Sequence, residues 1–267
     1  MDVFVVDRAR VCDALATVAE RVAALIRELP DTSAAVPGST WTVGETAAHL
    51  AMASQGFASL AEGTLFVHGD GTVGSLSEAN AEALRRSGER DGRVLGETIV
   101  GATASLADRL ASAPGDTVVA APVGPMDLGT LGSYGLLHLL QHGCHIASAL
   151  GRPVPVEGEH FELVLPFLAY IIPKVVNPDA TRGLDACFEI RLRRGPRFCV
   201  TFDDGEATVT TEPPRRVDCH LLADPATLFL VAMGVTSQWA GIARGRLWTW
   251  GLKPWLALRF VGFFEVP

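Results

Sequence analysis

Two histidines stand four residues apart in a segment that is otherwise apolar. The segment YGLLHLLQHGCHIASALGRP, residues 134–153, contains His138 and His142. Residues four apart on an α-helix share one face, so these two imidazoles can bind one metal ion. A lone histidine in such a helix is more often a packed core residue, but the pair favours metal ligation. His145 extends the stripe, yet it lies about 10 Å along the axis from His138, too far to bind the same ion comfortably.

A third ligand is expected from another helix. In TWTVGETAAHLAMASQGF, residues 40–57, Thr42 and Glu45 have the spacing of a capping box, which predicts a helix beginning near Val43. His49 then lies in the second turn, on the same face as Glu45. We predict that His49 joins His138 and His142. Spacing alone leaves a packed or surface role for His49 open.

Three neutral imidazoles would leave a divalent ion with an open position and its full charge. A thiol entering that position is deprotonated near neutral pH, so a cofactor can supply the nucleophilic sulfur. Such a thiolate either displaces a leaving group, as in an S-transferase, or adds reversibly to a conjugated double bond, as in a cis–trans isomerase. Two other functions stay open: a metal hydrolase that activates water, and a non-catalytic carrier of an apolar ligand. Zinc is the expected ion, with nickel or iron as alternatives.

Further candidate residues surround this prediction. Glu45 and His145 are expected to orient a ligand ring or move a proton. Arg86 is a candidate for contact with an anionic substrate, although arginines on a surface helix are usually only solvated. Trp248 and Trp250 are candidates for cofactor binding, as part of an apolar groove or a lid, with core packing as the alternative.

Three other side chains receive simpler interpretations. His68 and His160 lie among turn-forming residues and are expected to be exposed. Cys144 follows His142 by two residues, so it should face away from the pair and into the core.

Composition limits the class of protein. A net charge of −8 argues against a nucleic-acid partner, and the basic run RLRRGPR, residues 191–197, is interpreted as the solvated end of a hairpin. Five scattered cysteines suit a cytoplasmic protein with unpaired thiols. No signal peptide or membrane span is expected from the sequence, so the expected partners are small molecules, with no membrane and a monomer or homodimer.

The sequence of the first half predicts a helical bundle. Apolar residues recur every three or four positions from Val6 to Leu29, and helices are expected again from Val43 and within 76–113. Residues 116–132, rich in Val, Pro and Gly, are expected to form an extended connection to the His138 helix. This gives about four helices, a fold in which sites are built from facing side chains in the core.

The pattern changes after residue 155. Short β-branched or aromatic segments separated by turn residues predict an antiparallel meander, followed by a helix from Pro225 to Met233, a strand at 245–251 and a closing helix at 252–264. The predicted strands are 186–190, 198–202, 207–211 and 217–222. The expected domains are therefore an α-helical bundle at 1–155 and a smaller α+β domain with an antiparallel sheet at 156–267.

Three segments resemble a known family. WTVGETAAHLA at 41–51, PVGPMDLG at 122–129 and LLHLLQHGCHIASALGRP at 136–153 resemble the DinB-like superfamily, and within it the mycothiol-dependent maleylpyruvate isomerase N-terminal domain. The second half, from Asp224 through GRLWTWGLKPWLALRF, looks like the sterol-carrier-protein-type domain often fused to it. The resemblance implies a four-helix bundle and mycothiol as the thiol cosubstrate.

The resemblance also implies a ligand set. A histidine on the second helix and two residues four apart on the last helix would hold a divalent metal, which carries over to His49, His138 and His142. Isomerase-like members tend to have Glu at the position of His138, whereas three-histidine sites resemble the thiol transferases of the superfamily. The resemblance therefore implies a thiol-dependent transferase or isomerase.

Overall fold

The computed structural model describes residues 3–64, 66, 68–70, 72–114 and 116–265. It divides into two compact units. The helical unit comprises Val6–Val156, and the sheet unit comprises Glu157–Val266 together with Met1–Val5. The chain is thus helical in its first part and contains a sheet in its second, as the sequence predicts for the fold class.

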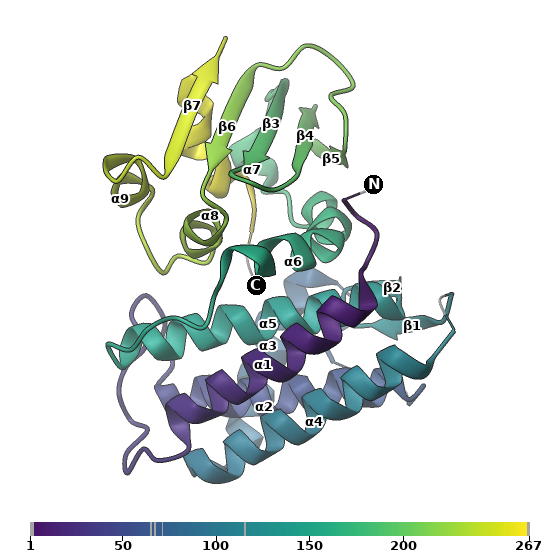
Figure 1. The fold of residues 1–267 in the computed structure, drawn as a ribbon, viewed down its shortest axis with the longest axis vertical. Helices are drawn as coiled ribbons and strands as arrows, with labels where there is room; N and C mark the ends of the chain where they lie inside the picture. The colour runs from purple at the N-terminus through teal and green to yellow at the C-terminus, as the bar shows by residue number, and fades with distance from the viewer. Residues whose placement is uncertain (1–2, 65, 67, 71, 115, 266–267) are drawn as a thin grey trace. The chain divides into compact units, whose positions relative to one another are not determined.

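The helical unit is a bundle of four long helices, α1, α2, α4 and α5, which Figure 1 shows side by side. Helices α1 and α2 each contact both α4 and α5, which closes the bundle around one core. Its elements, in chain order, are α1 (Arg8–Ile26), α2 (Val43–Ala61), η1 (Val73–Ser75), α3 (Leu76–Arg86), α4 (Gly92–Ser112), β1 (Val118–Ala121), β2 (Gly124–Asp127) and α5 (Leu128–Ala149).

The sequence explains why these helices begin and pack where they do. The apolar stripe of α1 is buried along its length, from Val11 to Ile26. Helix α2 starts at Val43 with the predicted capping box, in which Thr42 and Glu45 exchange hydrogen bonds. Helix α5 packs closely on its neighbours at two glycines. A β-carbon at Gly132 would lie 2.6 Å from Leu110, and one at Gly143 would lie 2.6 Å from Val22, so a larger residue would clash at either position.

The expected extended connection at 116–132 is only partly right. Strands β1 and β2 form an antiparallel hairpin there, pairing Val118 with Asp127. The last helix begins earlier than expected, at Leu128, because the Asp127 side chain accepts a hydrogen bond from the backbone N–H of Thr130 and caps it. This start adds the five residues 128–132, about one and a half turns, to α5 before His138.

The sheet unit combines a five-stranded sheet with short helices (Figure 1). Its elements are α6 (Gly158–Ile171), η2 (Ile172–Lys174), α7 (Pro178–Thr181), β3 (Ala186–Leu192), β4 (Arg197–Asp203), β5 (Glu206–Thr210), β6 (Cys219–Ala223), α8 (Pro225–Ala232), α9 (Gln238–Ala243), β7 (Leu247–Gly251) and η3 (Pro254–Phe263).

The sheet is not the predicted meander. Its strand order is β5-β4-β3-β6-β7, and β3 pairs with β6 in parallel, with Phe188 opposite Cys219. The sequence pattern gave the approximate positions of the strands but not this pairing, because one polar connection of eight residues between β5 and β6 carries no signal for the direction of the next strand. The closing segment is a 3-10 helix, η3, and not an α-helix.

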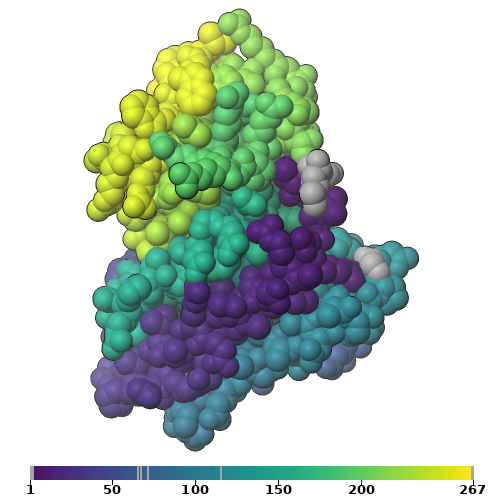
Figure 2. Space-filling model, viewed as in Figure 1, coloured from purple at the N-terminus to yellow at the C-terminus, as the bar shows by residue number. Residues whose placement is uncertain are grey.

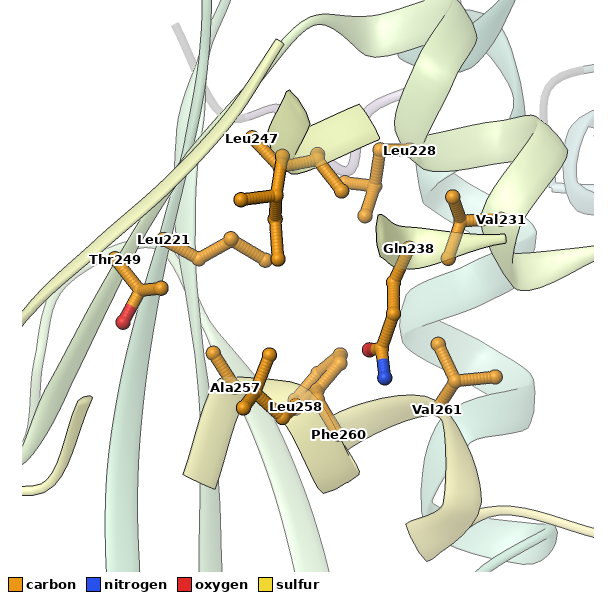
Figure 3. Close-up of a pocket in the computed structure, with 11 residues that line it drawn as sticks. Leu221, Leu228, Val231, Gln238, Leu247, Thr249, Ala257, Leu258, Phe260 and Val261 are labelled. Atoms are coloured by element: carbon orange, nitrogen blue, oxygen red, sulfur yellow. The ribbon is translucent and has the colours of Figure 1, made fainter. Parts of the chain in front are cut away.

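One face of the sheet packs against η3. Phe188 on this face packs against Phe260 and Phe263 of η3. The same face borders a pocket of about 30 Å³, into which Leu221 and Leu247 point (Figure 3). The predicted apolar groove does not coincide with this pocket, since neither Trp248 nor Trp250 is among the residues that line it.

Two expectations about exposure need correction. His160 is buried, because it lies in the first turn of α6 and its Nδ1 accepts a hydrogen bond from the backbone N–H of Glu157. His68 is half-buried and hydrogen-bonded to Asn80. Within the described residues, no helix is both long and apolar enough to cross a membrane.

Candidate metal centre

Three histidines from two helices meet inside the bundle. Each of His49 on α2 and His138 and His142 on α5 offers a ring nitrogen, and these atoms lie within 4.8 Å of one another. The Nε2 atoms of His49 and His138 are 3.0 Å apart. The ring centroids are 4.5 to 5.0 Å apart, so the three imidazoles surround a common point.

Helix geometry explains this convergence. His138 and His142 lie one turn apart on α5, as their spacing predicts. The capping box fixes the start of α2, which places His49 in the second turn, and α2 and α5 are in contact. The packing of the bundle brings His49 and His138 together although 89 positions separate them in the sequence.

The centre favours neutral imidazoles. Burial, with a smaller contribution from the charge of His68, lowers the pKa of His49 to about 4. Burial also holds the pKa of His138 and His142 well below the ordinary value, with neighbouring histidines contributing. A neutral imidazole has a free lone pair on one ring nitrogen, which is the form that binds metals.

The hydrogen bonding of the centre is incomplete without a ligand. Nδ1 of His142 is buried and has no hydrogen-bond partner among the described residues. The two Nε2 atoms that face each other at 3.0 Å can share only one proton. Because a buried polar atom without a partner costs about 1–3 kcal/mol, this arrangement fits a bound divalent ion that imidazole nitrogens prefer.

Aromatic side chains surround the three histidines. Trp41 lies 5.0 Å from His49 and 6.4 Å from His142 between ring centroids. Tyr134 and Phe57 meet His138 edge-on, and burial raises the pKa of Tyr134 to about 12. The surroundings of the imidazoles are therefore largely apolar.

The other predicted site residues are placed differently. Glu45 accepts hydrogen bonds from the backbone N–H and hydroxyl of Thr42, so its carboxylate is engaged in capping α2. The ring of His145 lies 5.7 Å from that of His142. Arg86 is exposed on α3 and pairs with Glu82 of the same helix.

The two predicted cofactor-binding tryptophans belong to the sheet unit. Trp248 and Trp250 lie on β7, and both are exposed. Trp250 stacks on His220 with 5.0 Å between ring centroids. Their part in cofactor binding stays a prediction.

Sequence reasoning missed the groups that surround the histidines. Tyr134 lies one turn before His138 on the same stripe of α5, so helical spacing alone could have identified it. His68 was interpreted as an exposed loop residue, yet its charge reaches His49 and His138. Nothing in the local sequence of the loop indicates that contribution, which depends on how the loop folds back.

The solved structures that resemble this chain share little sequence with it. A mycothiol-dependent maleylpyruvate isomerase is 13% identical, with a TM-score of 0.49 and coverage of 87% of this chain and 90% of that chain. The inverting sec-alkylsulfatase Pisa1 from Pseudomonas sp. and a double mutant of it are each 13% identical, with TM-scores of 0.35 and 0.34. These two alignments cover 52% of this chain, which spans 24% of the sulfatase.

A family model gives a stronger result. No curated protein matches the chain. The model described as mycothiol maleylpyruvate isomerase N-terminal domain matches residues 15–149, which is just over half of the chain and includes His49, His138 and His142. The chain therefore belongs to the mycothiol maleylpyruvate isomerase N-terminal domain family.

Proposed function

We propose that the protein is a metal-dependent enzyme that uses a low-molecular-weight thiol, mycothiol, either to isomerise a small electrophilic substrate or to transfer sulfur to it. The observation that carries this proposal is the group of three neutral imidazoles, two buried and one half-buried, with an unpaired Nδ1 on His142. Membership of a family named for a mycothiol-dependent isomerase supports the choice of thiol.

In this proposal His49, His138 and His142 hold one divalent ion, with zinc preferred to nickel or iron. When bound, such an ion supplies a positive charge that favours the deprotonated form of a thiol. Trp41 and Phe57 restrict the access of water to the imidazoles.

The cysteine nearest in sequence to these histidines is not suited to act as a nucleophile. Cys144 is the one cysteine on α5, and burial raises its pKa to about 12, so it stays protonated. An external thiol is therefore the more favourable source of the reacting sulfur.

The other predicted site residues keep separate roles in this proposal. His145 lies next to His142 and is the better candidate for moving a proton, since Glu45 already caps α2. Arg86 is kept as a candidate for substrate contact, and Trp248 and Trp250 for cofactor contact. We further propose that the sheet unit is a domain of the sterol-carrier-protein type, with domains at 1–155 and 156–267.

Metal content tests the centre directly. After purification in medium replete with zinc, nickel and iron, elemental analysis should find about one ion per chain, and His49→Ala and His142→Ala should each weaken binding by about a hundredfold or more. His145→Ala is the matched control on α5 and should retain the ion. Equal, near-zero metal in wild type and all variants would overturn the proposed centre.

Product analysis with and without added thiol tests the reaction class. A thiol-dependent enzyme converts a conjugated cis-diacid or an alkyl electrophile only when the thiol is present. Turnover of an ester in the absence of thiol would instead show a hydrolase, in which the same centre activates water.

A further inference from the structure

Exposed apolar side chains are concentrated around one edge of the sheet unit. Among the described residues, eight large hydrophobic side chains are exposed, and six of these lie between positions 239 and 258. Trp239, Trp248 and Trp255 are each about 60% exposed, and Trp250 is 42% exposed. Indoles in such numbers on a surface mark a site of interaction, because single scattered hydrophobic residues are the usual pattern.

The same part of the chain is positively charged. Residues 238–264 contain four cationic side chains and no acidic one, in a chain whose net charge is −8. Figure 2 shows the last part of the chain, in yellow, gathered on one side of the sheet unit. The cations are Arg244, Arg246, Lys253 and Arg259.

The fold brings a second basic segment to this edge. Arg193, in the hairpin between β3 and β4, donates a hydrogen bond of 2.7 Å from Nη2 to the carbonyl oxygen of Gly245. The indole Nε1 of Trp248 donates to the same oxygen, at 3.2 Å. A guanidinium and an exposed indole that are 55 positions apart in the sequence are thereby held side by side.

The charges at this edge are only partly neutralised by neighbours. Arg246 lies 3.7 Å from Asp224, and Lys253 lies 3.2 Å from Asp218. Arg193, Arg194 and Arg244 are exposed and form no ion pair with a carboxylate within the described residues. These three guanidinium groups are available to an anionic partner.

The combination of groups decides between possible occupants. A second copy of the chain is disfavoured, because a two-fold contact through this edge would place like charges opposite each other. A nucleic acid would use indoles for stacking but would gain nothing from the exposed aliphatic side chains Leu252 and Leu258. Tryptophan with arginine and exposed leucine is the combination found where proteins meet the headgroup region of a bilayer.

We propose that this edge, formed by Trp239, Trp248 and Trp250 with Arg193, Arg194 and Arg244, binds the surface of an anionic lipid bilayer. The indoles lie at the level of the headgroups, and the guanidinium groups contact lipid phosphates. The contact is peripheral, and it does not depend on the metal centre. It differs from the expectation from the sequence that no membrane is a partner.

Co-sedimentation of the full chain with vesicles tests this proposal. The protein should sediment with vesicles of phosphatidylcholine mixed with phosphatidylglycerol, much less with phosphatidylcholine alone, and binding should fall as salt is raised. Arg193→Ser with Arg194→Ser should weaken binding about thirtyfold, from about 1 kcal/mol for each arginine. Trp239→Ala with Trp248→Ala should also weaken it about tenfold or more.

Matched controls keep the test decisive. Arg85→Ser with Arg93→Ser removes two arginines of similar exposure from the helical unit and should leave binding unchanged. Circular dichroism of each variant establishes that it is folded. No binding to anionic vesicles, equal binding to both kinds of vesicle, or equal loss in the control variant would overturn the proposal, as would tighter binding to single-stranded nucleic acid than to vesicles.

Discussion

The two units each contain a cluster of titratable side chains around a buried group, and the clusters are built in opposite ways. In the helical unit, the rings of His49, His138 and His142 contact one another, several aromatic rings and the ring of His145. In the sheet unit, Glu189 is almost fully buried but accepts hydrogen bonds of 2.7 Å from Arg191 and 2.6 Å from His220. The first cluster leaves Nδ1 of His142 without a hydrogen-bond partner among the described residues, whereas the second gives its buried carboxylate two hydrogen-bond donors.

The electrostatics of the two clusters follow from this difference. Burial acts on Glu189 to raise its pKa, but the hydrogen bonds and charges of Arg191 and His220 outweigh burial and lower it. Nothing opposes burial at His142, whose pKa falls well below the ordinary value. A buried polar group with all its partners contributes to the fold, whereas one without partners indicates a ligand from outside the chain.

The largest expected change in stability comes from removing the buried carboxylate of Glu189. Glu189→Ala should destabilise the sheet unit by about 3 kcal/mol, because it leaves Arg191 and His220 without their acceptor. Denaturant unfolding followed by tryptophan fluorescence measures this change. Glu212→Ala is the control, since that carboxylate is 70% exposed and should change stability by less than about 0.5 kcal/mol. Equal effects of the two substitutions would show that the Glu189 cluster is not a stabilising network.

Replacing His142 should change the free energy of unfolding by a smaller amount and in the opposite direction. In chelator-treated protein, His142→Leu should raise the free energy of unfolding by about 1 kcal/mol, because it removes the unpaired Nδ1 from an apolar environment. Added zinc should stabilise wild type and leave the variant unchanged. Thermal unfolding with chelator and with zinc measures both quantities. Destabilisation of the variant under both conditions would mean that His142 is an ordinary core residue.

The smallest change in stability is expected on removing Glu45, the carboxylate nearest to His49 in the sequence. Hydrogen bonds from Thr42 lower the pKa of Glu45, so the unfolded chain takes up the proton first as pH falls. The stabilisation is complete above the unfolded pKa and disappears as pH falls through the lower folded value. Glu45→Ala should cost about 0.5–1 kcal/mol at neutral pH, and this cost should shrink in acid.

The same variant separates a structural from a chemical role for Glu45. Its zinc affinity should stay within about threefold of wild type, since the carboxylate is bonded to Thr42 and not to an imidazole. Unchanged stability together with a large loss of zinc affinity would place Glu45 beside the metal and would break the contrast between the two clusters.

The bundle was more predictable from sequence than the sheet. The apolar period of α1 and the capping box of α2 are local signals, and both elements formed where these signals place them. The pairing of β3 with β6 depends on a connection without periodicity, so the sequence contains no local signal for it. No element was predicted at helix α6, whose apolar run is interrupted by Pro166.

The centre shows the same division between local and distant information. The spacing of His138 and His142 is a local signal, and the structure brings both together with His49, whereas their role as ligands stays a prediction. The unpaired Nδ1 and the aromatic surroundings depend on packing between helices that are far apart in sequence. Local signals therefore identify residue types and faces, while the environment that sets their chemistry comes from tertiary contacts.

The position of the histidines has a mechanical consequence. An ion shared by His49 and His138 would join two helices across 89 residues of chain and act as a removable cross-link. A cross-link over a loop of that size restricts the unfolded chain by about 4–5 kcal/mol in simple entropy models. Loading and unloading of the ion would then set how long the bundle resists unfolding and proteolysis, so the supply of one trace element would govern the lifetime of the protein as well as its chemistry.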